Sequence, residues 1–202
     1  MRDRRRPPNL SGILPGEALG FPIPGWWPGR HNRLSPDEAA VAEFSVSAWR
    51  FCAAIDALLS SNGSERLELI GLHPVLATLY ATAANLPDVG EDEDVSIPFL
   101  VYGDRDDLLR QLTRRVGRFD DYRAVLDPWG GQEPHQGSLA DDLADIYAGV
   151  KPALLRLGQA GRVEATVWGL RFGFFSHWGE HLVGALRAVY FLARESEGDD
   201  EG

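Results

Sequence analysis

The sequence predicts an all-α protein, a single helical bundle of about five helices that follows a disordered N-terminal arm rich in proline, glycine and arginine. Apolar residues recur at three- and four-residue spacing in five segments, as on the buried face of a helix. Serine or aspartate precedes most of these segments, where such residues cap helices. The 202 residues, 44% of them hydrophobic, fit one globular domain with extensions. We expect a helical domain at 35–195 and an acidic, disordered tail at 196–202.

Residues 1–34 show no hydrophobic periodicity and are interrupted by six prolines. The arginines near the start are not followed by the apolar stretch of a signal peptide. The arm is interpreted either as a disordered extension or as a basic segment that binds phosphate or acidic partners. Its composition favours disorder. The pair Trp26 and Trp27 is expected to pack onto the domain or onto a partner.

The first two helices have clear start signals. Ser35 is a candidate N-cap before Pro36, and Asp37 and Glu38 favour the positive helix start. Cys52 lies on the apolar stripe of this helix, so we expect it to be a buried small hydrophobe rather than a nucleophile. Ser64 is expected to open the second helix. Proline cannot continue the hydrogen-bond ladder, so Pro74 predicts a kink there or a division after His73.

The middle of the chain is predicted to contain an acidic loop at 85–104 and a third helix capped by Asp104. The segment from Tyr122 to Trp129 then leads through Asp127-Pro128 into a turn region from Gly130 to Gly137. The third helix carries four arginines on its polar side. We expect them to pair with the acidic loops rather than to bind an anion, because exposed charge runs are usually solvated faces. They are Arg110, Arg114, Arg115 and Arg118.

The helix at 138–157 begins with the capping pattern Ser138-Leu-Ala-Asp141. At 100° per residue, Asp141 and Asp145 stack on one face away from the apolar stripe, and Asp142 lies on its flank. Like charges at these spacings repel each other. Asp145 is also too far from the helix start to benefit from its positive end, so it needs a partner.

The last helical segment, 163–193, offers such partners. Arg171 falls within its broad apolar face, where a guanidinium needs a carboxylate. His177 and His181 are four residues apart on the flank. Small residues on the other side (Gly169, Gly173 and Gly184) indicate close approach of a backbone or ligand.

Two imidazoles at this spacing can share a divalent metal ion, whose shell aspartates from a neighbouring helix can complete. The predicted polar site contains Asp141, Asp142, Asp145, Arg171, His177 and His181. Its predicted metal ligands are Asp142, Asp145, His177 and His181. The candidate ions are Mg²⁺, Mn²⁺ and Zn²⁺. The same residues also match the H-x-x-E-H pattern of inverse zinc peptidases, but Glu180 points away from the histidine edge and the chain ends soon afterwards.

Several motifs carry a family resemblance: Tyr122 with Asp127-Pro128, then S-L-A-D-D-L-A-D-I-Y, and finally F-x-x-H-W-G-x-H-x-x-x-A-L. Together they resemble the bacterial family catalogued as domain of unknown function 5063, over about 35–193. The resemblance implies the fold and its boundaries. It brings no established activity.

Composition limits the function. The net charge of −10 argues against general binding to nucleic-acid backbones. One cysteine excludes an internal disulfide, and no apolar run approaches the roughly 20 residues of a membrane helix. We therefore expect a cytoplasmic protein that binds a protein partner.

Two functional hypotheses remain. The favoured one is a non-catalytic helical accessory or protein-interaction module, in which Asp142 or Asp145 pairs with Arg171 and the polar residues fix helix register. The alternative is a metal-dependent hydrolase of a phosphorylated small molecule or nucleotide. In that case the aspartates at 141, 142 and 145 hold the metal and Arg171 or His177 meets phosphate. The only second acidic pair, Glu65 and Glu68, is explained by a helix start.

Overall fold

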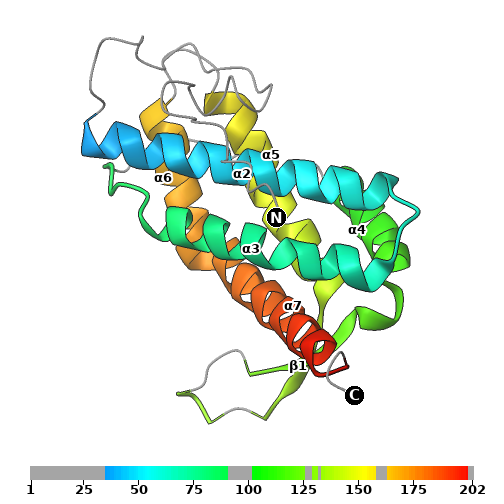
Figure 1. Ribbon diagram of the computed structural model, residues 1–202. Coiled ribbons are helices and arrows are strands. Elements are labelled where there is room, and N and C mark those ends of the chain that lie inside the picture. The colour runs from blue at the N-terminus through cyan, green and yellow to red at the C-terminus, as the bar shows by residue number, and fades with distance from the viewer. Residues whose placement is uncertain (1–34, 91–101, 126–128, 132, 158–162, 200–202) are drawn as a thin grey trace, which may run out of the picture.

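The computed structural model describes residues 35–90, 102–125, 129–131, 133–157 and 163–199. The predicted N-terminal arm with its tryptophan pair, the Asp127-Pro128 turn and the last residues of the tail lie outside this part of the chain. The described helices are α2 (Pro36–Ser60), α3 (Glu65–Ala84), α4 (Tyr102–Val116), α5 (Leu139–Leu157), α6 (Val163–Gly173) and α7 (Gly179–Asp199), and a π-helical turn, η2 (Phe174–Trp178), joins the last two (Figure 1). With α6, η2 and α7 counted as one continuous segment, the predicted all-α bundle of about five helices is confirmed.

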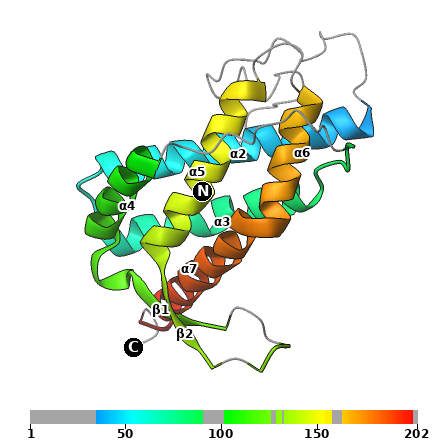
Figure 2. The same cartoon turned by 180° about the vertical axis from the view of Figure 1, so that it is seen from behind.

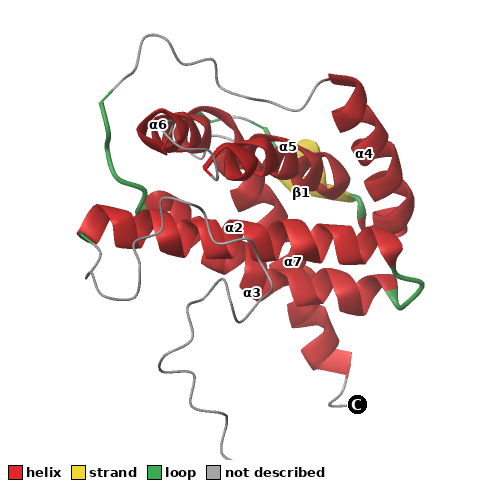
Figure 3. Cartoon of the chain, turned by 90° about the horizontal axis from the view of Figure 1, so that it is seen from above, coloured by secondary structure: helices red, strands yellow, loops and turns green. Residues whose placement is uncertain are grey.

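Helix α5 is the centre of the bundle and packs against α2, α4, α6 and α7. Seen from behind, it runs between α4 and α6 (Figure 2). From above, α6, α5 and α4 lie on one side of the α2–α3 pair (Figure 3). The core draws fully buried side chains from every layer, among them Phe51, Leu76, Leu112, Ile146 and Trp178. Burial of each such side chain contributes about 1.5–3 kcal/mol.

The predicted cap of α2 is confirmed. Ser35 and Glu38 form a reciprocal capping box, and Pro36 occupies the first turn. Ser64 stands at the N-cap of α3, although its side chain makes no capping hydrogen bond. The predicted burial of Cys52 is confirmed as well.

The predicted division of α3 after His73 is wrong, because the helix runs unbroken from Glu65 to Ala84. The alternative, a kink at Pro74, stays a prediction. Packing against α2 and α7 holds the segment helical despite the missing N–H group. In addition, α3 is long and apolar enough to cross a membrane by length and composition alone. The expectation that no apolar run approaches this length is therefore wrong for α3. The leucines at 69, 72, 76 and 79 are buried in this bundle, but only 28% of the apolar window is.

Helix α4 begins at Tyr102, so Asp104 lies in its first turn rather than at the cap. Among the described residues, Arg110 contacts Asp107 of its own helix and Arg118 covers the ring of Phe119. The partner of Arg115 is the start of α3, and the predicted acidic-loop partners at 91–94 lie outside the described residues. Arg115 pairs with Glu68 and donates a hydrogen bond to the carbonyl of Leu58. Glu68 therefore joins α3 to α4.

A β-hairpin occupies the region predicted as turns. Strands β1 (Asp121–Ala124) and β2 (His135–Ser138) are antiparallel, with Tyr122 opposite Gly137. A Cβ atom at Gly137 would lie 2.6 Å from Cζ of Tyr122, so only glycine leaves room for this ring. The strands have four residues each and no β-branched side chain, which explains why periodicity did not reveal them.

The hairpin leads directly into α5 and fixes its start. The Asp120 carboxylate accepts hydrogen bonds from the Ser138 hydroxyl and from the backbone N–H of Ala140, both at 2.8 Å. The Ser138 oxygen accepts one from the N–H of Asp141, as the capping pattern predicted. This start sets the rotation of α5 and hence the direction of its three aspartates.

Candidate functional site

Side chains from five elements meet beside the first two turns of α5. We call this group the polar cluster: Arg105 of α4, Tyr122 of β1, Asp141, Asp142 and Asp145 of α5, His177 of η2 and His181 of α7. All the predicted site residues except Arg171 belong to it. The N-terminal half of α5, α4 and the hairpin lie close together in Figure 2.

Arg105 neutralises two of the aspartates. Its Nε and one terminal nitrogen donate to the two oxygens of Asp145 at 2.7 and 2.6 Å, a bidentate pair. The same terminal nitrogen donates to Asp141 at 2.7 Å. Hydrogen bonds to Asp145 raise the pKa of Arg105 above its already high value. The like charges stacked on α5 are thus held together by a cation from α4.

Asp142 is the centre of a second group. Tyr122 donates its hydroxyl hydrogen to Oδ2 of Asp142, and Nδ1 of His181 lies 2.9 Å from Oδ1. Gly184 makes the approach possible, since a Cβ there would lie 2.4 Å from the tyrosine oxygen and 2.9 Å from the carboxylate. A close approach at Gly184 was predicted, but the neighbour is the side chain of Tyr122 rather than a backbone or a ligand.

Burial and hydrogen bonding shift the pKa values of this group. Burial raises the pKa of the Asp142 carboxyl, and the hydrogen bonds from His181 and Tyr122 oppose that shift. Burial and the bond to Asp142 together raise the pKa of Tyr122 well above its ordinary range. For His181, burial acts against the charged form, but the Asp142 hydrogen bond and the charge of Asp145 outweigh it and raise the pKa.

The π-helical turn positions the histidines. The N–H of Gly179 bonds to the carbonyl of Phe174 five residues earlier, and a Cβ at Gly179 would lie 2.2 Å from that oxygen. After the turn the ring centroids of His177 and His181 are 5.0 Å apart in an edge-on arrangement. Such turns inside α-helices occur frequently at functional sites.

The indole of Trp178 anchors this turn in the core. It is almost fully buried, and it lies where Cβ atoms at Gly149 of α5 and Gly173 of α6 would approach to 2.9 Å. At Gly173 too the close neighbour is a side chain, the indole of Trp178, rather than the predicted backbone or ligand. With Trp178 directed inward, the preceding His177 faces outward with 44% of its side chain exposed.

The predicted pairing of Arg171 with an aspartate of α5 is wrong. Arg171 donates a hydrogen bond to the carbonyl of Leu86 at 2.9 Å, lies 3.7 Å from the Asp88 carboxylate and covers the ring of Phe175. It ties the end of the α3 segment to α6. The guanidinium that α5 requires comes from Arg105 instead, 36 to 40 residues earlier in the chain.

Two members of the cluster were missed by the sequence reasoning. Arg105 has no periodic signal, because it lies in the first turn of a helix among charged neighbours. Tyr122 stood only in the family motif, and its ring reaches Asp142 because an unpredicted hairpin carries it there. One feature of the sequence did point to a nearby cation: the charge of Asp145, which the helix start does not stabilise.

Three groups of the cluster are arranged so that they could hold a metal ion. Donor atoms of Asp145, His177 and His181 all lie within 4.8 Å of one another. Asp142, predicted as a fourth ligand, stands behind His181 and binds its other ring nitrogen. The set combines two imidazole nitrogens with one carboxylate oxygen.

Comparisons with known proteins identify relatives without a described activity. The family model described as "Domain of unknown function (DUF5063)" matches residues 37–195, which confirms the resemblance seen in the sequence. The crystal structure of protein BF1032 from Bacteroides fragilis is similar, with a TM-score of 0.62 and 25% sequence identity. The similarity covers 75% of this chain and 90% of that one. No curated protein matches.

Proposed function

We propose that this chain, which belongs to the DUF5063 family of domains of unknown function, is a helical accessory module that binds a protein partner through the outward face of α7. The observation that carries the proposal is a row of exposed aromatic, apolar and arginine side chains along that helix. The residues, which we call the α7 stripe, are Val183, Arg187, Tyr190, Phe191 and Arg194.

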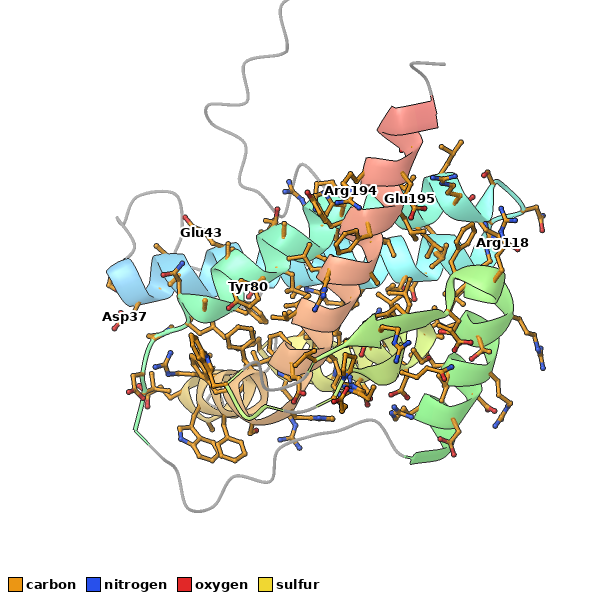
Figure 4. The ribbon with its side chains drawn as sticks, turned by 90° about the horizontal axis from the view of Figure 1, so that it is seen from below. Asp37, Glu43, Tyr80, Arg118, Arg194 and Glu195 are labelled. Carbon is orange, nitrogen blue, oxygen red and sulfur yellow. The ribbon has the colours of Figure 1, made fainter. Side chains whose placement is uncertain are left out.

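The α7 stripe follows helical spacing on the side opposite the core. Leu182, Ala185 and Val189 are fully buried, whereas Val183 and Tyr190 remain about half exposed, at 50% and 47%. A surface helix usually presents polar residues to solvent, so an outward row of large apolar side chains is typical of an interaction surface. Figure 4 shows α7 on the near side of the bundle, with Arg194 labelled near its end.

The composition of the stripe is that of an interface. The guanidinium of Arg194 lies 4.6 Å from the ring centroid of Phe191, and the rings of Tyr190 and Phe191 are 5.4 Å apart. Such contacts restrict the side chains before binding, which reduces the entropy that association costs. Tyrosine and arginine are also enriched among residues that dominate binding energy. Two arginines on a chain of net charge −10 favour an acidic partner surface.

The arrangement of the polar cluster also supports a module over a magnesium-dependent hydrolase. A hard cation such as Mg²⁺ is bound through carboxylate oxygens. Here Arg105 binds both Asp141 and Asp145, and Asp142 is engaged by Tyr122 and His181. Asp141, Asp142 and Asp145 therefore do not offer Mg²⁺ a set of carboxylates that is free of other partners, and the pair at Glu65 and Glu68 is engaged by Arg115.

The test uses site-specific photo-crosslinking in cells of the native host. A photoreactive amino acid replaces Tyr190 in the full chain, and the matched control carries it at Glu43, an exposed position on α2 that Figure 4 also labels. We expect position 190 alone to form a defined adduct, which mass spectrometry identifies. Equal adducts at both positions, or none at position 190, would contradict the proposal.

The identified partner is then purified and its affinity measured by calorimetry. Reversing the charges of Arg187 and Arg194 should weaken binding at least about tenfold, and added salt should weaken wild-type binding, because rim charges act through the solvent. The control reverses Arg110 and Arg114, two exposed arginines of α4, and so makes the same change in net charge. Equal losses in both double variants would show a general charge effect instead of a docking surface.

A further inference from the structure

The imidazoles of the polar cluster face Asp145 at distances that a direct hydrogen bond does not explain. Nε2 of His181 lies 3.5 Å from Oδ2 of Asp145, and Nε2 of His177 lies 3.7 Å from Oδ1. Hydrogen bonds between nitrogen and oxygen span about 2.7–3.2 Å. Ligands placed about 2.0–2.1 Å from a tetrahedral zinc ion are separated by about 3.3–3.4 Å. The observed spacings are close to this second value.

We propose that Asp145, His177 and His181 form a binding site for a divalent transition-metal ion of the zinc class, with one coordination position open to solvent. The proposal is independent of docking at the α7 stripe. Two imidazole nitrogens and one carboxylate oxygen suit zinc, whereas magnesium prefers oxygen ligands alone. The three donor atoms lie within 4.8 Å of one another, so side-chain rotations that bring them closer by up to about 1.5 Å would complete the site.

A second layer of hydrogen bonds prepares His181 for this role. Its Nδ1 contacts Asp142 at 2.9 Å, and Asp142 also accepts the hydroxyl hydrogen of Tyr122. With Nδ1–H donating to the carboxylate, the lone pair of Nε2 is directed at Asp145. Histidines that bind metals nearly always donate their other ring nitrogen to a carboxylate or carbonyl in this manner.

Arg105 is compatible with a metal ion at Asp145. Each carboxylate oxygen has two lone pairs, and the bidentate contact with Arg105 uses one on each. The guanidinium then fixes the orientation of the ligand carboxylate, as outer hydrogen bonds do in metal sites. The charges also favour a cation. Arg105 pairs with two of the three α5 carboxylates, Asp141 and Asp145, and Arg187 acts electrostatically on Tyr122. Three negative charges thus stand against two positive ones when the histidines are neutral.

The exposure of His177 indicates where the open position lies. The π-helical turn places this ring at the surface, with 44% of its side chain exposed, whereas Asp145 is 10% exposed. Three protein ligands leave the fourth position of a tetrahedral ion to water or to a small anionic ligand. Solvent reaches the site from the side of His177.

The experiment measures Zn²⁺ binding to the tag-free, EDTA-treated full chain by calorimetry, and repeats the titration with Co²⁺ as an optical probe. We expect one ion per chain and the strong visible absorption of four-coordinate Co²⁺. His177→Ala and His181→Ala should each weaken Zn²⁺ binding at least about 100-fold, and Asp142→Asn about 10–100-fold. His73→Ala is the matched control, because its ring lies against Tyr190 of the stripe rather than in the cluster.

Because His177 is exposed, its replacement by alanine should leave the melting temperature in EDTA nearly unchanged, so this variant decides the question even if His181→Ala fails to fold. Unchanged Zn²⁺ affinity in His177→Ala would overturn the proposal. An equal loss in His73→Ala would overturn it as well, since the ion would then bind elsewhere. Tight Mg²⁺ binding without Zn²⁺ binding would contradict the nitrogen-based site.

Discussion

Tyr122 on β1 donates its hydroxyl hydrogen to Asp142 on α5 across a gap that Gly184 of α7 leaves open. This contact joins the hairpin, the central helix and the last helix at one point. It also places a hydrogen-bonded carboxylate behind His181. Several measurable consequences follow from this arrangement.

Tyr122→Phe should destabilise the chain by about 1.5–3 kcal/mol, the range for a hydrogen bond to a charged group. The reason is that the buried Asp142 loses one of its two partners. Urea denaturation gives the free energy of unfolding. Tyr80→Phe is the control, since the Tyr80 ring packs edge-on against Phe174 at an exposed position, and it should change stability by no more than about 0.5 kcal/mol. Equal effects in both variants would contradict the role of the Tyr122 hydroxyl.

Gly184→Ala should destabilise the protein although alanine is the better helix former. The added Cβ would meet the Tyr122 oxygen at 2.4 Å and force that contact apart. The control is Gly71→Ala on α3, where a Cβ has no neighbour within 4 Å. That change should stabilise by about 0.5–1 kcal/mol through helix propensity. Thermal unfolding of both variants should therefore shift in opposite directions, and shifts in the same direction would refute the steric argument.

Arg105→Gln should cost about 3 kcal/mol, because it leaves the carboxylate of Asp145 buried without its cation. Arg110→Gln also removes an ion pair, but Arg110 and Asp107 are more than half exposed, so its cost should stay below about 1 kcal/mol. Chemical denaturation compares the two. If Arg105→Gln lowered the free energy of unfolding as little as Arg110→Gln does, the bidentate pair would contribute no more to stability than an exposed ion pair.

Because the thiol of Cys52 is buried, we expect the folded chain to lose stability at high pH. Burial raises the pKa of its thiol to about 12 from an ordinary value of 9.0, and the charge of Lys151 only partly offsets this shift. The stabilising contribution is complete below pH 9.0 and declines as the pH rises toward about 12, because only the unfolded chain ionises its thiol there. At pH 10 the loss is on the order of 1 kcal/mol.

The measurement is the difference in free energy of unfolding between the wild type and Cys52→Ala, taken at pH 8 and at pH 10. Other titrating groups cancel in this difference, so the stability advantage of the wild type should shrink by an amount on the order of 1 kcal/mol. A constant difference would mean that the thiol ionises equally in both states. The native thiol should also react slowly with iodoacetamide until the chain unfolds, because the thiolate is the nucleophile.

Much of the fold was determined by local sequence. The apolar spacing of α2, α3 and α5 and the caps at Ser35 and Ser138 predicted helices because both signals act within one or two turns. The helical periodicity of 100° per residue also predicted which aspartates of α5 share a face. It also predicted that Asp145 needs a partner, but not which residue supplies it. Gly173 and Gly184 indicated close approach for a local reason as well. Glycine lowers the stability of the helix that contains it, so its presence there indicates a close neighbour.

Tertiary structure decided the rest. The partner of Asp145 is Arg105 rather than Arg171, and Tyr122 reaches Asp142 only because a short hairpin turns it toward α5. The contacts of Arg105 and Tyr122 join residues 20 to 40 positions apart, and no periodic pattern encodes them. The π-helical turn that sets His177 beside His181 depends in the same way on the burial of Trp178 between two other helices. Sequence periodicity therefore determined the helices and the residues that required partners, whereas packing between helices decided which partners they have.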